Sequence, residues 1–252
     1  MRYAVLTSGS CGNCYAFFDG ERTILVDAGL TLTGLRRRLE DVGIPIDTVS
    51  DVFVTHMHPD HSKGLGVLYR RIGARIHASR ACMESDESIF NRLGLKRDDV
   101  DVFDFGDRIE GGGFAITPFR TSHDSAGSAG YHMVTPSVSF FLMTDTGLFS
   151  DESVEIASTS DVLFVESNYD EAMLENGGYP AFLKRRIDGP RGHMSNAQAR
   201  DFLQKAGALD RQVFLIHLSD NNNTVEAVRR LYEGLPSVTV CERGRTYGGY
   251  DV

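Results

Sequence analysis

The stretch Asp51-Val52-Phe53-Val54-Thr55-His56-Met57-His58-Pro59-Asp60-His61 places three histidines and one carboxylate directly after a short apolar run. The run predicts a buried strand, and Pro59 stiffens the turn that follows it. Imidazole nitrogens and carboxylate oxygens are ligands of zinc, manganese and iron, and this set holds more ligand atoms than one tetrahedral ion takes. The spacing H-x-H-x-D-H therefore predicts two adjacent metal ions in one pocket. The alternative, a polar surface loop, is disfavoured because a strand aims the turn.

Length and composition are those of an ordinary globular protein, with 252 residues, 41% of them hydrophobic and 24% charged. The sequence has no apolar run of about 18 residues, so no membrane partner is expected. The first residues, Met1–Thr7, enter a strand-like segment without the apolar core of a signal peptide, and we expect a cytoplasmic location. The net charge of −9 argues against a generally basic surface, so any nucleic acid must be bound by a local patch.

Two of the four cysteines, Cys11 and Cys14, form a C-x-x-C inside a turn-rich loop. A structural zinc there would need two further ligands, and no second C-x-x-C supplies them. We therefore expect reduced or packed thiols rather than a zinc knuckle.

Apolar periodicity and turn residues give a coarse order of elements. We expect strands at Tyr3–Leu6, Tyr15–Phe18, Thr23–Val26, Arg75–Ala78, Phe114–Arg120, Ser137–Met143, Asp161–Val165 and Arg211–Ile216, with Val238–Val240 closing the fold. We expect helices at Thr31–Val42, Gly64–Ile72, Arg80–Arg97 and Tyr179–Ile187, one capped by Ser195 or Asn196 that runs through Lys205, and one capped by Asn223; Asp98–Asp107 is read as a charged loop. Two strand-rich halves with interleaved helices predict a layered α/β sandwich that forms a single domain over residues 1–252.

Polar residues recur where the predicted strands end. They are Asp27, His56, His58, Asp60, His61, His123, Asp145, Glu166, His193 and His217, and they include six of the eight histidines. Open α/β sheets build their sites at such ends, so we expect these side chains to converge. A buried carboxylate needs hydrogen bonds, so Asp27 is either a turn former or a support for the histidine loop. The remaining histidines, His77 and His132, are read as ordinary strand residues.

These features resemble the metallo-β-lactamase superfamily of binuclear hydrolases, whose fold is an αββα four-layer sandwich. Longer motifs resemble the YycJ/WalJ-like branch of that superfamily: S-G-S-x-G-N-C, T-H-x-H-x-D-H-x-K-G-L-G-V-L, T-D-T-G, V-E-S-N-x-D and L-K-R-R-I-x-G-x-x-G-H-x-S-N. Cys11 stands where that branch is expected to have serine, so Cys14 is the better match to its cysteine. Neither residue is needed as a ligand.

The resemblance implies one metal ion held by His56, His58 and His123 and a second held by Asp60, His61 and His217, with Asp145 bridging the two. Zinc is favoured, and manganese or iron suits the same donors. Such a pair of ions can share a hydroxide that acts as the nucleophile, with Asp60 orienting it. The resemblance also implies that Asp27 and Glu166 support the ligands without binding metal.

His193 matches no metal position of the superfamily and resembles the non-ligand histidine of ribonuclease Z-type phosphodiesterases. A histidine there can protonate the alkoxide that leaves a phosphodiester. Basic residues surround it in the sequence, namely Lys184, Arg185, Arg186 and Arg191, and Lys63 follows the metal motif. They are read as phosphate-binding residues; the alternative is a solvated helix face.

The function that the resemblance implies is a metal-dependent phosphodiesterase acting on nucleic acid, specifically a 5′-to-3′ exonuclease on double-stranded DNA. Because fold does not decide substrate, a glyoxalase II-like thioester or lactone hydrolase is the alternative enzyme. It leaves His193 and the basic residues without a task. A secreted β-lactamase and a flavodiiron-type redox enzyme fit less well, and a metal-bound regulatory module without turnover is the non-enzymatic alternative.

Overall fold

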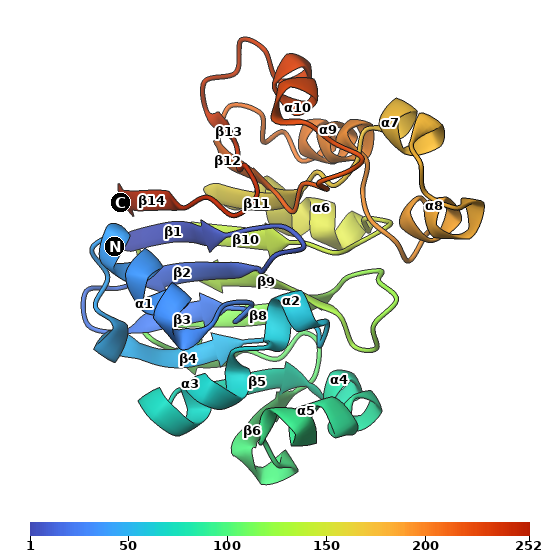
Figure 1. The fold of residues 1–252 in the computed structure, drawn as a ribbon. Coiled ribbons are helices and arrows are strands. Elements are labelled where there is room, and N and C mark those ends of the chain that lie inside the picture. Colours follow the sequence, from blue (N-terminus) through green and yellow to red (C-terminus); the bar gives the residue numbers. More distant parts are fainter.

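The computed structural model describes residues 1–252 and consists of two seven-stranded sheets packed face to face (Figure 1). In spatial order the first sheet contains β14 (Tyr247–Asp251), β1 (Arg2–Thr7), β2 (Cys14–Phe18), β3 (Thr23–Val26), β4 (Val49–Phe53), β5 (Arg75–Ser79) and β6 (Val100–Phe103). The second contains β13 (Val238–Val240), β12 (Gln212–Ile216), β11 (Val162–Glu166), β10 (Ser139–Met143), β9 (Ala129–Val134), β8 (Phe114–Arg120) and β7 (Ile109–Gly111). Neighbouring strands are parallel from β3 to β6 and from β10 to β13, and antiparallel elsewhere.

Helices cover the outer faces of the sheets (Figure 1). The first half of the chain contributes α1 (Leu32–Asp41), α2 (Pro59–Ser62), α3 (Leu65–Ile72), α4 (Arg80–Ser85) and α5 (Glu87–Leu93), with short 3₁₀ turns η1 (Ile46–Thr48) and η2 (Arg97–Asp99). The second half contributes α6 (Asp151–Ser158), α7 (Glu171–Asn176), α8 (Ala181–Ile187), α9 (Asn196–Lys205) and α10 (Val225–Leu231). No helix has both the length and the apolar character needed to cross a membrane. The arrangement confirms the predicted αββα sandwich.

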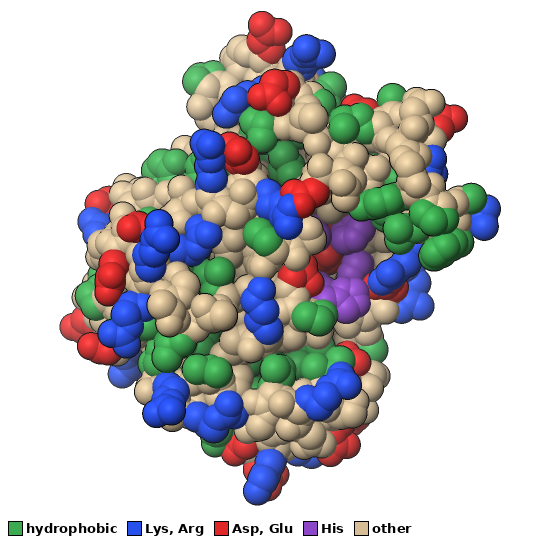
Figure 2. Space-filling model, in the orientation of Figure 1, with side chains coloured by type: hydrophobic (Ala, Val, Ile, Leu, Met, Phe, Trp, Pro, Cys, Tyr) green, Lys and Arg blue, Asp and Glu red, His purple; other side chains and the backbone are tan.

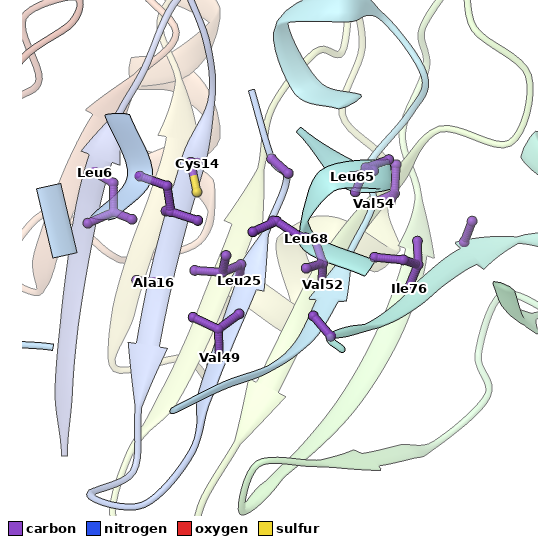
Figure 3. Close-up of a cluster of buried hydrophobic side chains, with 14 of the residues drawn as sticks. Leu6, Cys14, Ala16, Leu25, Val49, Val52, Val54, Leu65, Leu68 and Ile76 are labelled. Atoms are coloured by element: carbon purple, nitrogen blue, oxygen red, sulfur yellow. The ribbon is translucent and has the colours of Figure 1, made fainter. Parts of the chain in front are cut away.

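Strict alternation of side chains along the strands divides the core into layers. On β1, Ala4 and Leu6 belong to the outer apolar cluster under α1, while Tyr3 and Val5 belong to the cluster between the sheets. Figure 3 shows the outer cluster, in which Leu6 lies in line with side chains of the neighbouring strands. A shift of one residue in register would exchange the two sets, so the apolar pattern fixes the pairing.

Aromatic rings fill the layer between the sheets. The rings of Phe17 and Phe140, one from each sheet, pack edge to face with centroids 5.1 Å apart, and Phe164 and Phe214 stack at 4.9 Å within the second sheet. All four side chains are fully buried. Burial of one such side chain is worth about 1.5–3 kcal/mol, so this layer holds the two sheets in a fixed relation. The strand ends of both sheets are thereby held at one edge.

The predicted end of the fold is wrong. Val238–Val240 is β13 at the edge of the second sheet, and the chain continues to β14, which pairs antiparallel with β1 in the first sheet. The segment reads Y-G-G-Y-D, and its two glycines weaken the strand signal. Pairing with β1, rather than local propensity, makes it a strand.

Three boundaries in other regions also differ from the prediction. The helical region Arg80–Arg97 is divided into α4 and α5 at Asp86, and Gly94 ends α5 in a left-handed conformation. The charged segment Asp98–Asp107 contains β6, in which Val100 and Val102 pack into the outer apolar cluster and Phe103 into the layer between the sheets. Thr224, not Asn223, caps α10, because its hydroxyl accepts a hydrogen bond from the Ala227 amide.

Candidate metal centre

The carboxyl ends of strands from both sheets meet at one edge of the sandwich. In the first half, β3 ends before Asp27 and β4 is followed by the histidine loop and α2. In the second half, single polar residues follow β8, β10 and β12 or end β11; they are His123, Asp145, His217 and Glu166. Apart from the half-exposed His58 and Asp60, the polar residues at these strand ends and in the histidine loop are buried. The predicted convergence of strand-end residues is therefore present in the fold.

Two groups of three ligand-type residues lie side by side. In each group the candidate ligand atoms are all within 4.8 Å of one another; one group is His56, His58 and His123, and the other is Asp60, His61 and His217. Asp145 lies between the groups, with Oδ2 3.2 Å from His61 Nε2 and Oδ1 3.7 Å from His123 Nε2. These positions are compatible with the distribution of ligands that the resemblance implies, and the ligand-type atoms of Asp145, Glu166, His193 and His217 also lie within 4.8 Å of one another.

The inward-facing nitrogens suit metal ions. His56 Nε2 and His217 Nε2 are buried and have no hydrogen-bond partner. A buried polar atom without a partner costs about 1–3 kcal/mol, and coordination to a cation satisfies it. A set of imidazoles and carboxylates fits zinc, manganese or iron. The residues present therefore fit a pair of divalent ions.

The outward-facing nitrogens of four histidines are held by hydrogen bonds. His61 Nδ1 donates to Asp27 Oδ2 (2.7 Å), and His56 Nδ1 donates to the Thr55 hydroxyl (3.1 Å). Two more histidines in the second half are held similarly: His123 Nδ1 by the Gly192 carbonyl (3.0 Å) and His217 Nδ1 by Glu166 Oε1 (3.1 Å). Such bonds fix the ring and leave the other nitrogen for an ion.

Asp27 has no contact with solvent and is fully engaged. The Thr55 backbone N–H donates to its Oδ1 (2.8 Å), and the Thr55 hydroxyl donates to Oδ2 (2.8 Å). Together with the bond from His61, these contacts tie the end of β3 to the histidine loop. Of the two interpretations that the sequence left open, the geometry is that of a hydrogen-bonded support.

Carboxylates and imidazoles packed together in the centre shift the pKa values of one another. Burial opposes a charge on Asp145, but the surrounding histidines, led by His217, outweigh burial and hold the pKa of its carboxyl well below the usual range. Burial also opposes a charge on His217, but Asp145 and Asp60 outweigh it and raise the pKa of this imidazole to about 10. Buried ionised carboxylates of this kind favour the binding of cations.

Backbone strain is concentrated in the same centre. Asp27, Asp145 and His217 have φ values of 62°, 52° and 58°, and they are the only residues other than glycine with positive φ. Asp27 and His217 directly follow a strand, and Asp145 lies two residues after the end of β10. Left-handed backbone costs an L-residue roughly 1–2 kcal/mol, and such strain gathers at functional sites. The turn directs each of these side chains into the centre.

The comparison with known proteins agrees with this geometry. Residues 22–218 match the family described as "Beta-lactamase superfamily domain". This chain belongs to the β-lactamase superfamily. It is 31% identical to "Exodeoxyribonuclease WalJ" of Streptococcus pneumoniae over 227 residues, which are 90% of this chain and 84% of that protein. It is 33% identical to "Exodeoxyribonuclease YycJ" of Bacillus anthracis over 232 residues, 91% of this chain and 86% of that protein.

The solved structure of YhfI from Bacillus subtilis, described as a metallo-β-lactamase fold protein, has the same fold as this superfamily member. The two superimpose with a TM-score of 0.71 over 98% of both chains at 18% sequence identity. Family membership and the histidine–carboxylate cluster together identify the chain as a metal-dependent hydrolase. The resemblance stated from the sequence is confirmed.

The centre of this superfamily member opens into a cavity of about 270 Å³. His193 lines it, and its Nδ1 donates to Glu166 Oε1 (2.7 Å) and lies 3.5 Å from Asp145 Oδ1. Figure 2 shows histidines at the bottom of a hollow, with hydrophobic side chains beside them where Figure 1 places α8. His193 thus lies at the wall of the cavity, beside the carboxylate of Asp145.

Of the five basic residues predicted to bind phosphate, the structure places Arg186 on the cavity. It forms an ion pair with Asp124. Arg191 Nε donates to the His123 carbonyl, Lys184 Nζ to the Glu175 carbonyl and Lys63 Nζ to the Cys11 carbonyl. Arg185 is exposed and does not line the cavity. The basic residues are therefore dispersed rather than gathered into one cluster.

Several residues of the site carried no signal that the sequence analysis used. Asn13 donates to Asp60 Oδ2 (3.2 Å) and Asn168 to the His217 carbonyl (2.9 Å), and Asp124 lies beside His58. Asn13 and Asn168 stand inside motifs that resemble the YycJ/WalJ-like branch. Membership of these motifs is the sequence signal that would have indicated them. Asp124 follows His123 directly.

The other histidines and the cysteines lie outside the centre. His77 stacks on Phe53 with ring centroids 4.2 Å apart and donates to Asp51 Oδ1 (2.8 Å), and His132 is a half-buried residue of β9. Cys14 is buried, and burial raises the pKa of its thiol, whereas Cys11 is exposed. No disulfide links the four cysteines.

Proposed function

We propose that this hydrolase is a phosphodiesterase that uses two divalent ions to degrade DNA from an end, 5′ to 3′ on double-stranded DNA. The two adjoining ligand groups with Asp145 between them support a pair of ions. The relatives WalJ and YycJ are named exodeoxyribonucleases, which supports DNA as the substrate. Bound ions of this kind lower the pKa of water and neutralise charge on a phosphate.

The observation that carries the proposal is the pair formed by His193 and Glu166. Glu166 is fully buried and accepts a hydrogen bond from His193 Nδ1, so the imidazole has a fixed orientation and its Nε2 remains available. A positioned imidazole can protonate an alkoxide leaving group. Phosphodiester cleavage in nucleic acid releases such an alkoxide, whereas a thioester releases a thiolate that needs no proton. The pair therefore favours a phosphodiester over a thioester substrate.

Side chains on α8 suit the remainder of a nucleotide. Leu183, Arg186 and Ile187 line the cavity at helical spacing, and Tyr179 joins them from the preceding turn. Phe182 lies one turn before Arg186 on the same helix, is 68% exposed and does not itself line the cavity. A guanidinium can bind phosphate and an aromatic ring can stack on a base, and both kinds of contact support a nucleic-acid substrate.

The test is cleavage of end-labelled duplex DNA, single-stranded DNA and RNA in the presence of Mn²⁺ or Zn²⁺. Duplexes carrying the label at the 5′ or the 3′ end distinguish the two polarities, and an internally labelled circle distinguishes exonuclease from endonuclease activity. We expect release of 5′ label as mononucleotides, no cleavage of the circle, and no release by Asp60→Ala. Intact nucleic acid together with turnover of a thioester or lactone would contradict the proposal.

A further inference from the structure

One histidine of the centre lacks the support that the other four have. His56, His61, His123 and His217 each donate Nδ1 to an oxygen atom of the protein. His58 differs: its Nδ1 faces His123 Nε2 at 3.4 Å, so Nε2 is the nitrogen that points away from that neighbour. His58 Nε2 makes no hydrogen bond, and the side chain is about one-third exposed, at 35%.

The carboxylate that lies within 4 Å of His58 Nε2 belongs to Asp124. Its Oδ1 lies 3.6 Å from His58 Nε2 and 3.4 Å from His123 Nε2, is buried and has no hydrogen-bond partner. Its Oδ2 accepts a hydrogen bond from Arg186 on α8. One carboxylate thus faces a candidate ligand with one oxygen and the rim of the cavity with the other.

We infer that Asp124 is the positioning residue of His58, accepting its Nε2–H as Asp27 accepts the Nδ1–H of His61. Binding of an ion to His58 fixes its other nitrogen as the donor, and a small rotation of the ring closes the 3.6 Å separation to a hydrogen bond. The inference rests on the two-ion centre of the proposed function and not on the identity of the substrate.

The same carboxylate also connects the ion centre to α8. The hydrogen bond to Asp124 Oδ2 holds Arg186 at the cavity. The carboxylate that positions His58 therefore also positions the guanidinium that an approaching phosphate would meet. Charge favours a carboxylate in this place: three imidazole ligands would bring no negative charge to their ion, and an adjoining carboxylate would offset part of the charge of the ion.

A simpler role for Asp124 would be to anchor Arg186 alone, and a set of variants separates the two roles. Asp124→Ala removes both contacts. Asp124→Asn retains an oxygen that can accept from His58 but loses the ion pair. Arg186→Gln loses the ion pair and leaves the carboxylate in place. Asp98→Ala, an exposed carboxylate outside the cavity, is the matched control.

The measurement is Zn²⁺ affinity of the ion-free protein by competition with a chromophoric chelator, together with the visible spectrum of the Co²⁺-loaded protein. For Asp124→Ala we expect an affinity loss of about 10-fold at one of two sites and an altered Co²⁺ spectrum. Asp124→Asn should recover most of the affinity, and Arg186→Gln and Asp98→Ala should match the wild type.

Wild-type affinity and spectrum in Asp124→Ala would overturn the inference, as would an equal loss in Arg186→Gln. Circular dichroism and thermal melting of each variant show whether it is folded. Because the readout is ion binding, loss of affinity in Asp124→Ala supports the inference whether or not the wild type cleaves DNA. The experiment therefore distinguishes failure of the proposed nuclease function from failure of the positioning role of Asp124.

Discussion

The two halves of the molecule build the centre in different ways. The first half supplies four candidate ligands from one turn, His56 to His61, placed directly after β4. The second half supplies three, His123, Asp145 and His217, each from the end of a different strand. It also supplies most of the groups that line the cavity, including His193 and the cavity-facing residues of α8, while Ser10, His58 and Asp60 line it from the first half.

The two sets of ligands are positioned by different features of the chain, one local and one set by the arrangement of strands. A ligand cluster within one turn is local, so its geometry follows from spacing alone. Ligands on separate strands converge only because β8, β10 and β12 run in the same direction within the second sheet, with β9 and β11 between them, and because the aromatic layer sets this sheet against the other. The ligands of the first half can therefore be recognised as a short sequence motif. The ligands of the second half come together only when the sheet forms.

Removal of one carboxylate from each half is the most severe test of this comparison. We expect Asp60→Ala and Asp145→Ala each to lower kcat/KM for bis(p-nitrophenyl) phosphate by at least about 10³-fold, because each loses charge that faces an ion. Asp98→Ala should retain wild-type activity. If either carboxylate variant turned over like the wild type, that half would not be needed for the chemistry.

His193→Ala tests a contribution that the second half makes alone. We expect kcat on DNA to fall by about 10²–10³-fold because the alkoxide leaves without a proton donor. Turnover of bis(p-nitrophenyl) phosphate should fall far less, since p-nitrophenolate leaves readily as an anion. The ratio of the two kcat values is the measurement, with His132→Ala as the histidine control. Equal losses on both substrates would argue against proton donation.

Removal of ions by a chelator tests whether the centre joins the halves. An ion that is present at about a hundredfold excess over its Kd stabilises the folded protein by about 2.7 kcal/mol. For a chain of this size we expect ion removal to lower Tm by about 5–10 °C. Thermal melting followed by circular dichroism, with and without Zn²⁺, measures the shift, and Asp60→Ala should show a smaller one. An unchanged Tm would mean that the ions do not stabilise the fold.

Acid should weaken the first half through Asp51, which lies away from the centre. Burial opposes its ionisation, but hydrogen bonds from His77, Ser50 and Arg75 outweigh burial and lower the pKa of Asp51 from 3.8 to about 2. A depressed pKa stabilises the fold fully above pH 3.8, and this stability is lost as pH falls towards 2.

The corresponding measurement compares the wild type with Asp51→Asn by urea unfolding. We expect the wild type to lose about 2 kcal/mol more than the variant between pH 5 and pH 2. Parallel pH dependence of the two proteins would show that Asp51 contributes nothing to acid sensitivity.

Phe182→Ala should have the smallest effect, because it would remove only a proposed stacking contact with the substrate. Loss of one stacking contact should raise KM for DNA by roughly 5- to 30-fold and leave kcat unchanged. Turnover of bis(p-nitrophenyl) phosphate should not change, because that substrate has no base to stack. Since Phe182 is exposed, its removal should leave Tm as in the wild type. An unchanged KM for DNA would assign the exposed ring no role in binding.

The sequence predicted most of the strands because they depend on local pattern, and it predicted the convergence of their ends because polar residues recur where the predicted strands end. It failed for β14, which is a strand only through its pairing with β1, at the opposite end of the chain. It also failed for the division of Arg80–Arg97, since a helix break at Asp86 leaves little trace in composition.

The supports of the centre were predicted unevenly for the same reason. Asp27 was indicated by its place after an apolar run, and the structure joins it to His61. Asn13 and Asp124 were not indicated, because their contacts with Asp60 and His58 span a large separation in sequence. Basic residues close together in sequence were expected to share a surface, but α8 directs Arg186 to the cavity and Lys184 to the Glu175 carbonyl.

The left-handed backbone at positions 27, 145 and 217 implies a conflict between durability and activity. Glycine adopts this conformation freely, so Asp27, Asp145 and His217 each retain a backbone penalty that glycine would remove. Selection for heat resistance on the ion-free protein would therefore act against the candidate ligands Asp145 and His217, whereas Asp27 offsets its penalty through hydrogen bonds from Thr55 and His61. In a laboratory evolution experiment without divalent ions and without an activity screen, positions 145 and 217 are where we expect the chain to lose its function first.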